Sequence, residues 1–81
     1  MPHFWLGVCM STKSFYKVVG ENITNLRKEK RVSQEKLAYG AQLDRTYMGK
    51  IEKGIVNPSL KVLKKIARTL KLTVSTLTKG V

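Results

Sequence analysis

The segment SQEKLAYGAQLDRTYMGKIEKG, residues 33–54, holds two short runs of apolar residues at helical spacing with a break between them. The apolar positions are Leu37, Ala38 and Ala41 in the first run, and Met48 and Ile51 in the second. Ser33 and Asp44 precede the two runs, and both residue types cap helices by accepting backbone N–H groups. The spacing therefore predicts two short helices in tandem, joined by a tight turn.

Residues 15–30 predict a longer helix before this pair. Val19, Ile23 and Leu26 recur there at i, i+4 and i+7, which is the spacing of one buried helix face. The second helix of the pair ends at Gly54, because glycine readily adopts the conformation of a helix C-terminal cap, and Pro58 breaks the chain soon after.

Two further helices are expected after this break. Ser59 and Thr73 are their predicted N-caps, and the last helix runs to about residue 78. The predicted buried positions are Leu60, Leu63, Ala67 and Leu70 in the fourth helix, and Val74 and Leu77 in the fifth. The sequence thus predicts an all-α fold, a compact five-helix bundle over residues 15–81, after an irregular N-terminal tail at residues 1–14.

The charge balance indicates the kind of partner. The chain has 16 Lys and Arg against 5 Asp and Glu, a net charge of +11 over 81 residues. Such an excess repels itself unless a polyanion is near, so nucleic acid is the leading partner. Membrane surfaces also attract basic chains, but the apolar helix faces are needed for a mutual core. The apolar stretch at residues 1–10 is too short to span a bilayer.

Catalytic and metal chemistry are not indicated. Cys9 is the single cysteine and His3 the single histidine, so they offer neither an intramolecular disulfide nor a zinc ligand set. No paired carboxylates and no glycine-rich phosphate loop are visible in the sequence. We therefore expect a chain that is not an enzyme, needs no cofactor or metal, and belongs to a reducing compartment, the cytoplasm.

The tandem helices resemble the helix-turn-helix of the phage-repressor-like family. The matching residues are Ser33, Gln34, Glu35, Leu37, Ala38, Asp44, Ile51, Glu52 and Gly54. The resemblance continues through NPSLKVLKKIARTLKLTVSTL, and LDRTY at residues 43–47 is similar to the controller proteins of restriction-modification systems. It implies a transcriptional regulator that binds double-stranded DNA sequence-specifically, as a homodimer on a palindromic operator.

One face of the second helix of the pair is a candidate DNA-binding surface. Counting about 100° per residue from Asp44 places a group of polar residues and one glycine opposite Met48 and Ile51. The resemblance assigns Gln34 to a phosphate, and Arg45, Thr46 and Lys50 to base edges or adjacent phosphates. The expected DNA-binding residues are Ser33, Gln34, Arg45, Thr46, Tyr47, Gly49, Lys50 and Lys53. Alternatives remain open: a solvated Arg45, a Lys50 that meets phosphate alone, and a Tyr47 that packs inward.

The resemblance also bears on two structural positions. Arg27 and Glu52 stand where the family places an ion pair between its first helix and the end of the recognition helix. Gln42 stands in the turn where the family commonly has Gly. Either Gln42 adopts a left-handed conformation, which suits Gly or Asn better, or the second helix ends early with Gly40 as its cap.

The C-terminal segment is the expected dimer interface. Leu72, Val74, Leu77 and Val81 crowd a short stretch, and a helix of barely two turns has room to bury only some of them in its own subunit. The alternative is that Val74 and Leu77 close the core of the monomer. A different function also remains open, the antitoxin of a toxin-antitoxin pair, which binds a protein partner as well as DNA.

Overall fold

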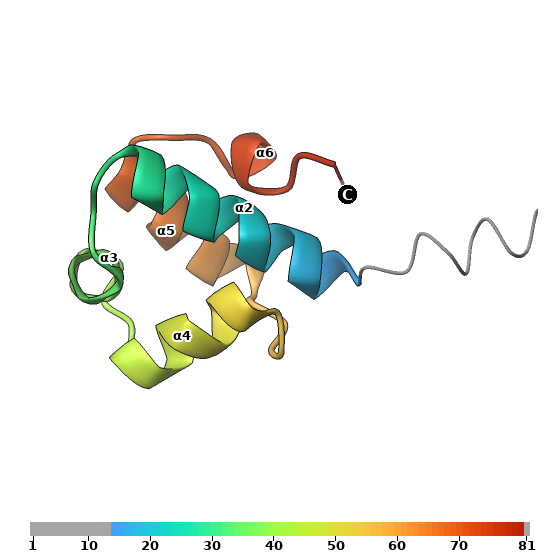
Figure 1. Cartoon of the computed structure of the whole chain (residues 1–81), viewed down its shortest axis with the longest axis horizontal. Helices are drawn as coiled ribbons and strands as arrows, with labels where there is room; N and C mark the ends of the chain where they lie inside the picture. Colours follow the sequence, from blue (N-terminus) through green and yellow to red (C-terminus); the bar gives the residue numbers. More distant parts are fainter. Residues whose placement is uncertain (1–13, 81) are drawn as a thin grey trace, which may run out of the picture.

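Five α-helices make up most of residues 14–80, the part of the chain that the computed structural model describes (Figure 1). They are α2 (Phe15–Glu29), α3 (Gln34–Gly40), α4 (Arg45–Lys53), α5 (Leu60–Leu70) and α6 (Val74–Leu77). The predicted all-α fold with tandem helices is confirmed. Residues 1–13 of the predicted tail, which include His3 and Cys9, lie outside the described residues, and so does the terminal Val81. Within residues 14–80, no helix is long and apolar enough to cross a membrane.

Each of these helices begins at a polar N-cap. The cap side chain accepts a hydrogen bond from the backbone N–H three residues later, over 3.0 to 3.3 Å. The caps are Ser14, Ser33, Asp44, Ser59 and Thr73. The four caps predicted from the sequence are confirmed, and Ser14, the last residue of the predicted tail, is the N-cap of α2.

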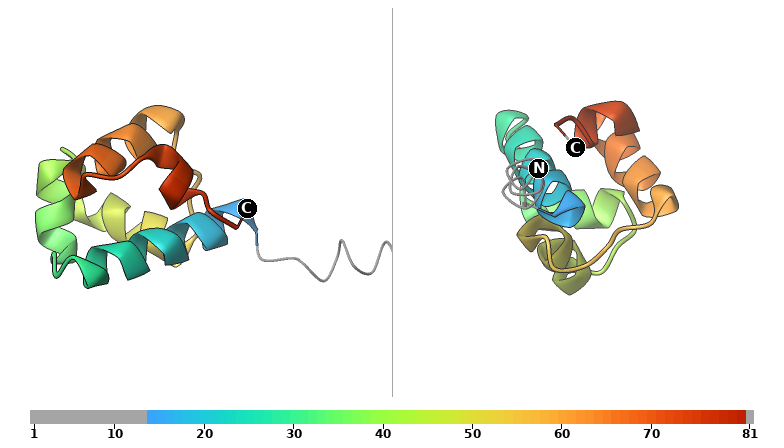
Figure 2. Two further views of the ribbon diagram at one scale, coloured as in Figure 1. Left: turned by 90° about the horizontal axis from the view of Figure 1, so that it is seen from above. Right: turned by 90° about the vertical axis from the view of Figure 1, so that its right-hand side faces the viewer.

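The helices pack so that α4 lies at one edge of the molecule. Contacts join α2 to α4 and α6, and α5 to α3 and α6, while α3 also packs on α4. In Figure 1, α3 is seen end-on where α4 is seen along its length, so the tandem helices cross steeply. The right-hand view of Figure 2 also shows α4 at the edge of the molecule, and the left-hand view shows the chain after α6 beside the start of α2. One long side of α4 is therefore not covered by another helix.

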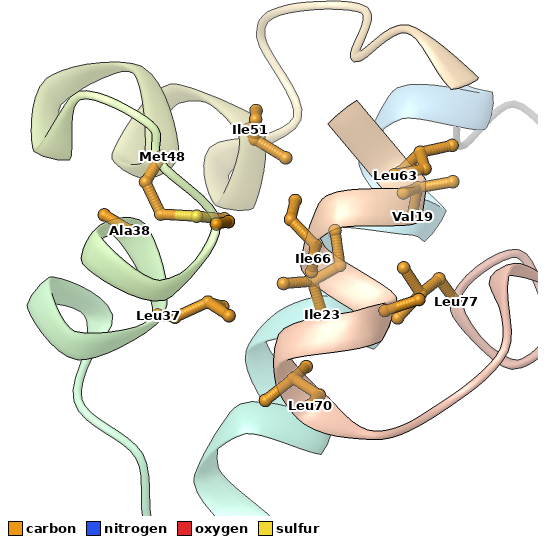
Figure 3. Close-up of a cluster of buried hydrophobic side chains, with 12 residues drawn as sticks. Val19, Ile23, Leu37, Ala38, Met48, Ile51, Leu63, Ile66, Leu70 and Leu77 are labelled. Carbon is orange, nitrogen blue, oxygen red and sulfur yellow. The ribbon is translucent and has the colours of Figure 1, made fainter. Parts of the chain in front are cut away.

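The core is built from apolar residues of all five of these helices (Figure 3). The predicted positions Val19, Ile23, Leu37, Ala38, Ala41, Met48, Ile51, Leu63, Ala67, Leu70 and Leu77 are buried. The prediction for Leu60 is wrong, since its side chain is 60% exposed. Leu60 is the first residue of α5, one turn before the first buried residue of that helix, so this turn extends past the core. Ile66, which was not predicted, is fully buried in the same stripe.

Two glycines let the end of α4 lie directly on the backbone of α2. A Cβ atom at Gly20 would stand 2.5 Å from the carbonyl oxygen of Ile51, closer than real Cβ contacts. Gly54, with a φ of 76°, caps α4 in the left-handed conformation and approaches the Cα atom of Lys17. No side chain fits between the two helices here, so the backbone of α2 sets the position of α4.

The turn between α3 and α4 uses Gln42 in the left-handed conformation, with a φ of 58°. Gly40 is the last residue of α3 and Ala41 its C-cap, so Gly40 is not the cap of an early helix end. The backbone N–H of Leu43 donates to the carbonyl oxygen of Ala38 over 2.8 Å and closes the turn. Of the two alternatives for this turn, the structure has the one in which Gln42 bears the unfavourable conformation.

Replacing Gln42 with glycine is therefore expected to stabilise the fold. A left-handed conformation costs an L-residue about 1–2 kcal/mol, and glycine avoids that cost while losing more entropy on folding. We expect Gln42→Gly to raise the free energy of unfolding by about 0.5–1 kcal/mol, measured by urea denaturation. Gln42→Val should lower it, because a β-branched side chain fits this conformation worst. Equal stability of all three chains would contradict the account of the turn.

Candidate nucleic-acid interface

The exposed side of α4 carries hydroxyl and cationic groups. Met48 and Ile51 point into the core with no exposed surface, which settles the rotation of the helix. Arg45, Thr46 and Lys50 are exposed on the other side, and Lys53 is exposed in the last turn. The structure thus separates an apolar face from a face rich in hydrogen-bond donors, as the spacing predicted.

The predicted ion pair between Arg27 and Glu52 is confirmed. The Nε atom of Arg27 lies 2.8 Å from Oε2 of Glu52, and the two side chains are 12% and 6% exposed. Arg27 also donates from Nη2 to Oε1 of Glu52 over 3.1 Å, and from Nη1 to the carbonyl oxygen of Val32 over 2.9 Å. One guanidinium therefore ties α2 to the end of α4 and to the loop that leads into α3.

Gln34 continues this network from Glu52 to the start of α4. Its Nε2 donates to Oε1 of Glu52 over 3.1 Å, and its Oε1 accepts from Nε of Arg45 over 3.3 Å. The amide is oriented because Glu52 offers only acceptors and Arg45 only donors. The bond engages Nε of Arg45, and the two terminal amino groups are a pair of donors that a bidentate acceptor can meet end-on.

The structure brings together most of the predicted DNA-binding residues. Gln34 lies beside Gly49, and Arg45 bonds to Gln34. Ser33 is used as the cap of α3. Tyr47 is half-buried and packs against the core, in keeping with the open alternative that it packs inward.

Thr24 and Asn22 also make polar contacts that were not predicted from the sequence. Thr24 donates from Oγ1 to Oε1 of Glu52 over 3.0 Å, and so adds a second residue of α2 to the network. Asn22 donates to the carbonyl oxygens of Leu77 and Lys79 over 2.9 and 2.8 Å, which fastens the C-terminal segment to α2. A signal for Thr24 existed, because Gly20, Thr24 and Arg27 are spaced along one helix face.

This geometry defines a class of protein. A short helix packed across a second one, with the donor-rich face of the second left open, is the arrangement of a helix-turn-helix DNA-binding domain. The family model described as helix-turn-helix matches residues 23–77. The chain belongs to this helix-turn-helix family of DNA-binding transcriptional regulators, which are not enzymes.

Curated relatives include phage and restriction-modification proteins. Control protein C.MunI of Mycoplasma sp is 48% identical over 59 residues, which cover 72% of this chain and 80% of that protein. The immunity repressor of Bacillus phage phi105 is 42% identical over 57 residues, or 70% of this chain. The matched part spans only 40% of the length of that repressor, so the similarity concerns one domain of it.

A solved structure shows the same fold at similar length. The restriction-modification controller protein C.AhdI from Aeromonas hydrophila superimposes with a TM-score of 0.75 and 37% sequence identity. The match covers 76% of this chain and 94% of that protein. The resemblance to phage repressors and controller proteins is confirmed by these comparisons.

Loss of the Glu52 carboxylate should destabilise the domain strongly. Glu52→Ala leaves the largely buried guanidinium of Arg27 without its counter-charge, and breaking such a pair costs about 3–5 kcal/mol. Urea denaturation of the variant should show a fall of this size in the free energy of unfolding. Glu35→Ala removes the same charge from an exposed position in the first turn of α3 and is the matched control, expected to change stability by at most about 1 kcal/mol, the size of a charge–dipole effect. Similar effects of the two substitutions would contradict the structural role of Glu52.

Proposed function

We propose that this chain is a sequence-specific regulator that acts as a homodimer on a palindromic operator, in the role of a restriction-modification controller. The observation that carries the proposal is the bonded row from Arg27 through Glu52 and Gln34 to Arg45. It places an exposed arginine at the start of a helix that lies on the edge of the molecule. An arginine in that position is suited to a guanine.

The major groove of DNA explains why such a helix serves recognition. The groove admits one α-helix and shows a distinct pattern of donors and acceptors for each base pair. In this proposal α4 lies in the groove, with Arg45 and Thr46 toward base edges. Gln34 and the N-terminal part of α3 meet the phosphate backbone, where Ser33 lies close by. Lys50 and Lys53 contact base edges or adjacent phosphates.

The charge of the chain supports the same partner. The net charge of +11 favours a polyanion over any neutral surface. Such contacts release counterions from DNA, so affinity falls with salt, and this part of binding carries no sequence information. Specificity therefore depends on the few side chains of α4 that reach base edges.

The role of controller rests on relatives of comparable size. C.MunI and C.AhdI are named as control or controller proteins, and the matches cover 80% and 94% of their lengths. The phage repressor shares only part of its length with this chain. Selection of bound duplexes from a random pool, and mapping of the selected sequence beside restriction-modification genes, tests this role. A selected sequence that lies elsewhere would reject it.

Arg45→Ala is expected to relax the sequence preference. A bidentate contact from an arginine to O6 and N7 of guanine is worth about 1–3 kcal/mol of discrimination. The variant should lose affinity for the selected duplex and keep its affinity for random DNA, measured by fluorescence anisotropy at fixed salt. Gln34→Ala should lower the affinity for both duplexes, because it removes a proposed phosphate contact, and should lower it more for the selected duplex, because Arg45 then lacks its partner. If Arg45→Ala loses equal affinity for the selected duplex and for random DNA, Arg45 contacts a phosphate and not a base.

The proposed dimer interface is narrower than the sequence predicted. Leu77 has no exposed surface and belongs to the core of its own subunit, in keeping with the alternative that it closes the core of the monomer, so the proposed contact does not include it. Leu72 and Val74 are half-buried and keep part of their surface open. We propose these two residues as the centre of an isologous contact. Asn22 supports the proposed contact, because its hydrogen bonds hold the end of α6 and the residues after it against α2.

Val74→Glu tests the interface without emptying the core. A carboxylate that a second copy would have to bury should shift the chain to a folded monomer in analytical ultracentrifugation. The monomer should bind DNA weakly and without sequence preference, because one recognition helix offers few base contacts. Ser75→Glu, on the exposed neighbouring position, is the matched control and should remain dimeric. A wild-type chain that sediments as a monomer at every accessible concentration would reject the dimer.

A further inference from the structure

Most glycines of the helical framework have a packing reason to lack a side chain. A Cβ atom at Gly20 would meet backbone oxygens of α4 at 2.5 Å, and one at Gly40 would meet the Cγ2 atom of Thr69 at 2.6 Å. Gly54 combines a left-handed backbone with a close approach to Lys17. At Gly20 and Gly54 the obstacle to a side chain is backbone, and at Gly40 the side chain of Thr69 would have to shift, so each of the three glycines has a packing reason.

Gly49 has no such reason. It is the middle residue of α4, its φ lies outside the left-handed range, and an added Cβ atom would meet only the side-chain amide of Gln34, at 3.7 and 3.9 Å. Those are ordinary van der Waals distances. Alanine would fit the folded chain there and would favour the helix, since glycine is among the least favourable residues in a helix interior. The glycine lowers the stability of α4 without any gain in packing.

The surroundings of Gly49 point to an outside molecule as the reason. One turn before it stands Arg45 and one turn after it Lys53, and the amide of Gln34 lies beside it. The helix surface therefore projects least at Gly49, and side chains that donate hydrogen bonds surround this position. A flat, rigid ligand that brings its acceptors to these donors comes closest to the helix at Gly49.

We propose that Gly49 is the point where the major-groove edge of a base pair touches the backbone of α4, so that the missing side chain sets how deeply the helix lies in the groove. The inference rests on the proposed DNA-binding function and deepens it. The hydroxyl of Thr46, one turn away from Gly49, is carried on a short side chain. A short donor reaches a base edge only if the helix backbone is close to the groove floor. A methyl group at position 49 would hold the helix away and weaken these contacts together.

Gly49→Ala should therefore change stability and binding in opposite directions. The melting temperature is expected to rise by about 4–8 °C, because alanine is the better helix former and meets no clash. Affinity for the duplex selected by the wild-type chain should fall about tenfold, while affinity for random DNA at the same salt should change little. Both affinities are measured by fluorescence anisotropy on the full chain.

Two control variants distinguish loss of the DNA contact at position 49 from effects of altered stability. Asn25→Ala places alanine on the exposed side of α2, and it should raise the melting temperature without changing either affinity. Gly20→Ala should lower the melting temperature, because its new methyl group meets the backbone of α4. Together they show whether stabilisation by itself alters binding.

The outcomes distinguish this inference from the function on which it rests. Unchanged affinity of Gly49→Ala for the selected duplex overturns the inference, and so does an equal loss on both duplexes, which would mean contact with the sugar-phosphate backbone. A lowered melting temperature would overturn it too, since the glycine would then be required by the fold. A wild-type chain that selects no sequence from the pool defeats the proposed function instead, whatever the variant does.

Discussion

The carboxylate of Glu52 is the group on which the arrangement of α2, α3 and α4 depends. It stands in α4 and accepts hydrogen bonds from Thr24 and Arg27 of α2 and from Gln34 of α3. A largely buried charge of this kind is stable only when its oxygens are all engaged, because the alternative is an uncompensated charge out of water. Any other relative position of the three helices would break one of these bonds. The apolar core alone gives no such penalty, since apolar contacts are not directional.

The shortness of the helices makes this constraint necessary. α3 has 7 residues and α4 has 9, and helices of that length are marginal in water without tertiary contacts. Their N-caps decide where they begin, but not how they lie relative to each other. The crossing is set by the small residues Ala38 and Ala41 in the core, by the turn at Gln42, and by the contacts of Glu52. The orientation of Arg45 is thus a consequence of packing several residues away.

Glycines of this chain stand in two different settings, some between packed helices and one on an exposed helix face. At Gly20 and Gly54 the absence of a side chain lets α4 rest on α2, and the fold gains a fixed helix position in return. At Gly49 the same absence gives the fold nothing, and the proposed contact with DNA would account for it. A DNA-binding domain with one small core thus carries a local loss of helix stability on its exposed face, where proteins commonly keep groups that serve binding and not folding.

The sequence by itself determined the local features of this protein: the class of fold, the N-caps, and the apolar face of each longer helix. These depend on residues a few positions apart, so spacing and residue type suffice to predict them. The ion pair of Arg27 and Glu52 was predictable through the family pattern alone. The tertiary structure decided that Leu60 is exposed, that Leu77 belongs to the core of its own subunit, and that Thr24 and Asn22 hold distant segments. The contacts of Thr24 and Asn22 join segments more than 25 residues apart in the chain. Local spacing places Thr24 on the same helix face as Gly20 and Arg27, but it does not show which distant residue Thr24 contacts.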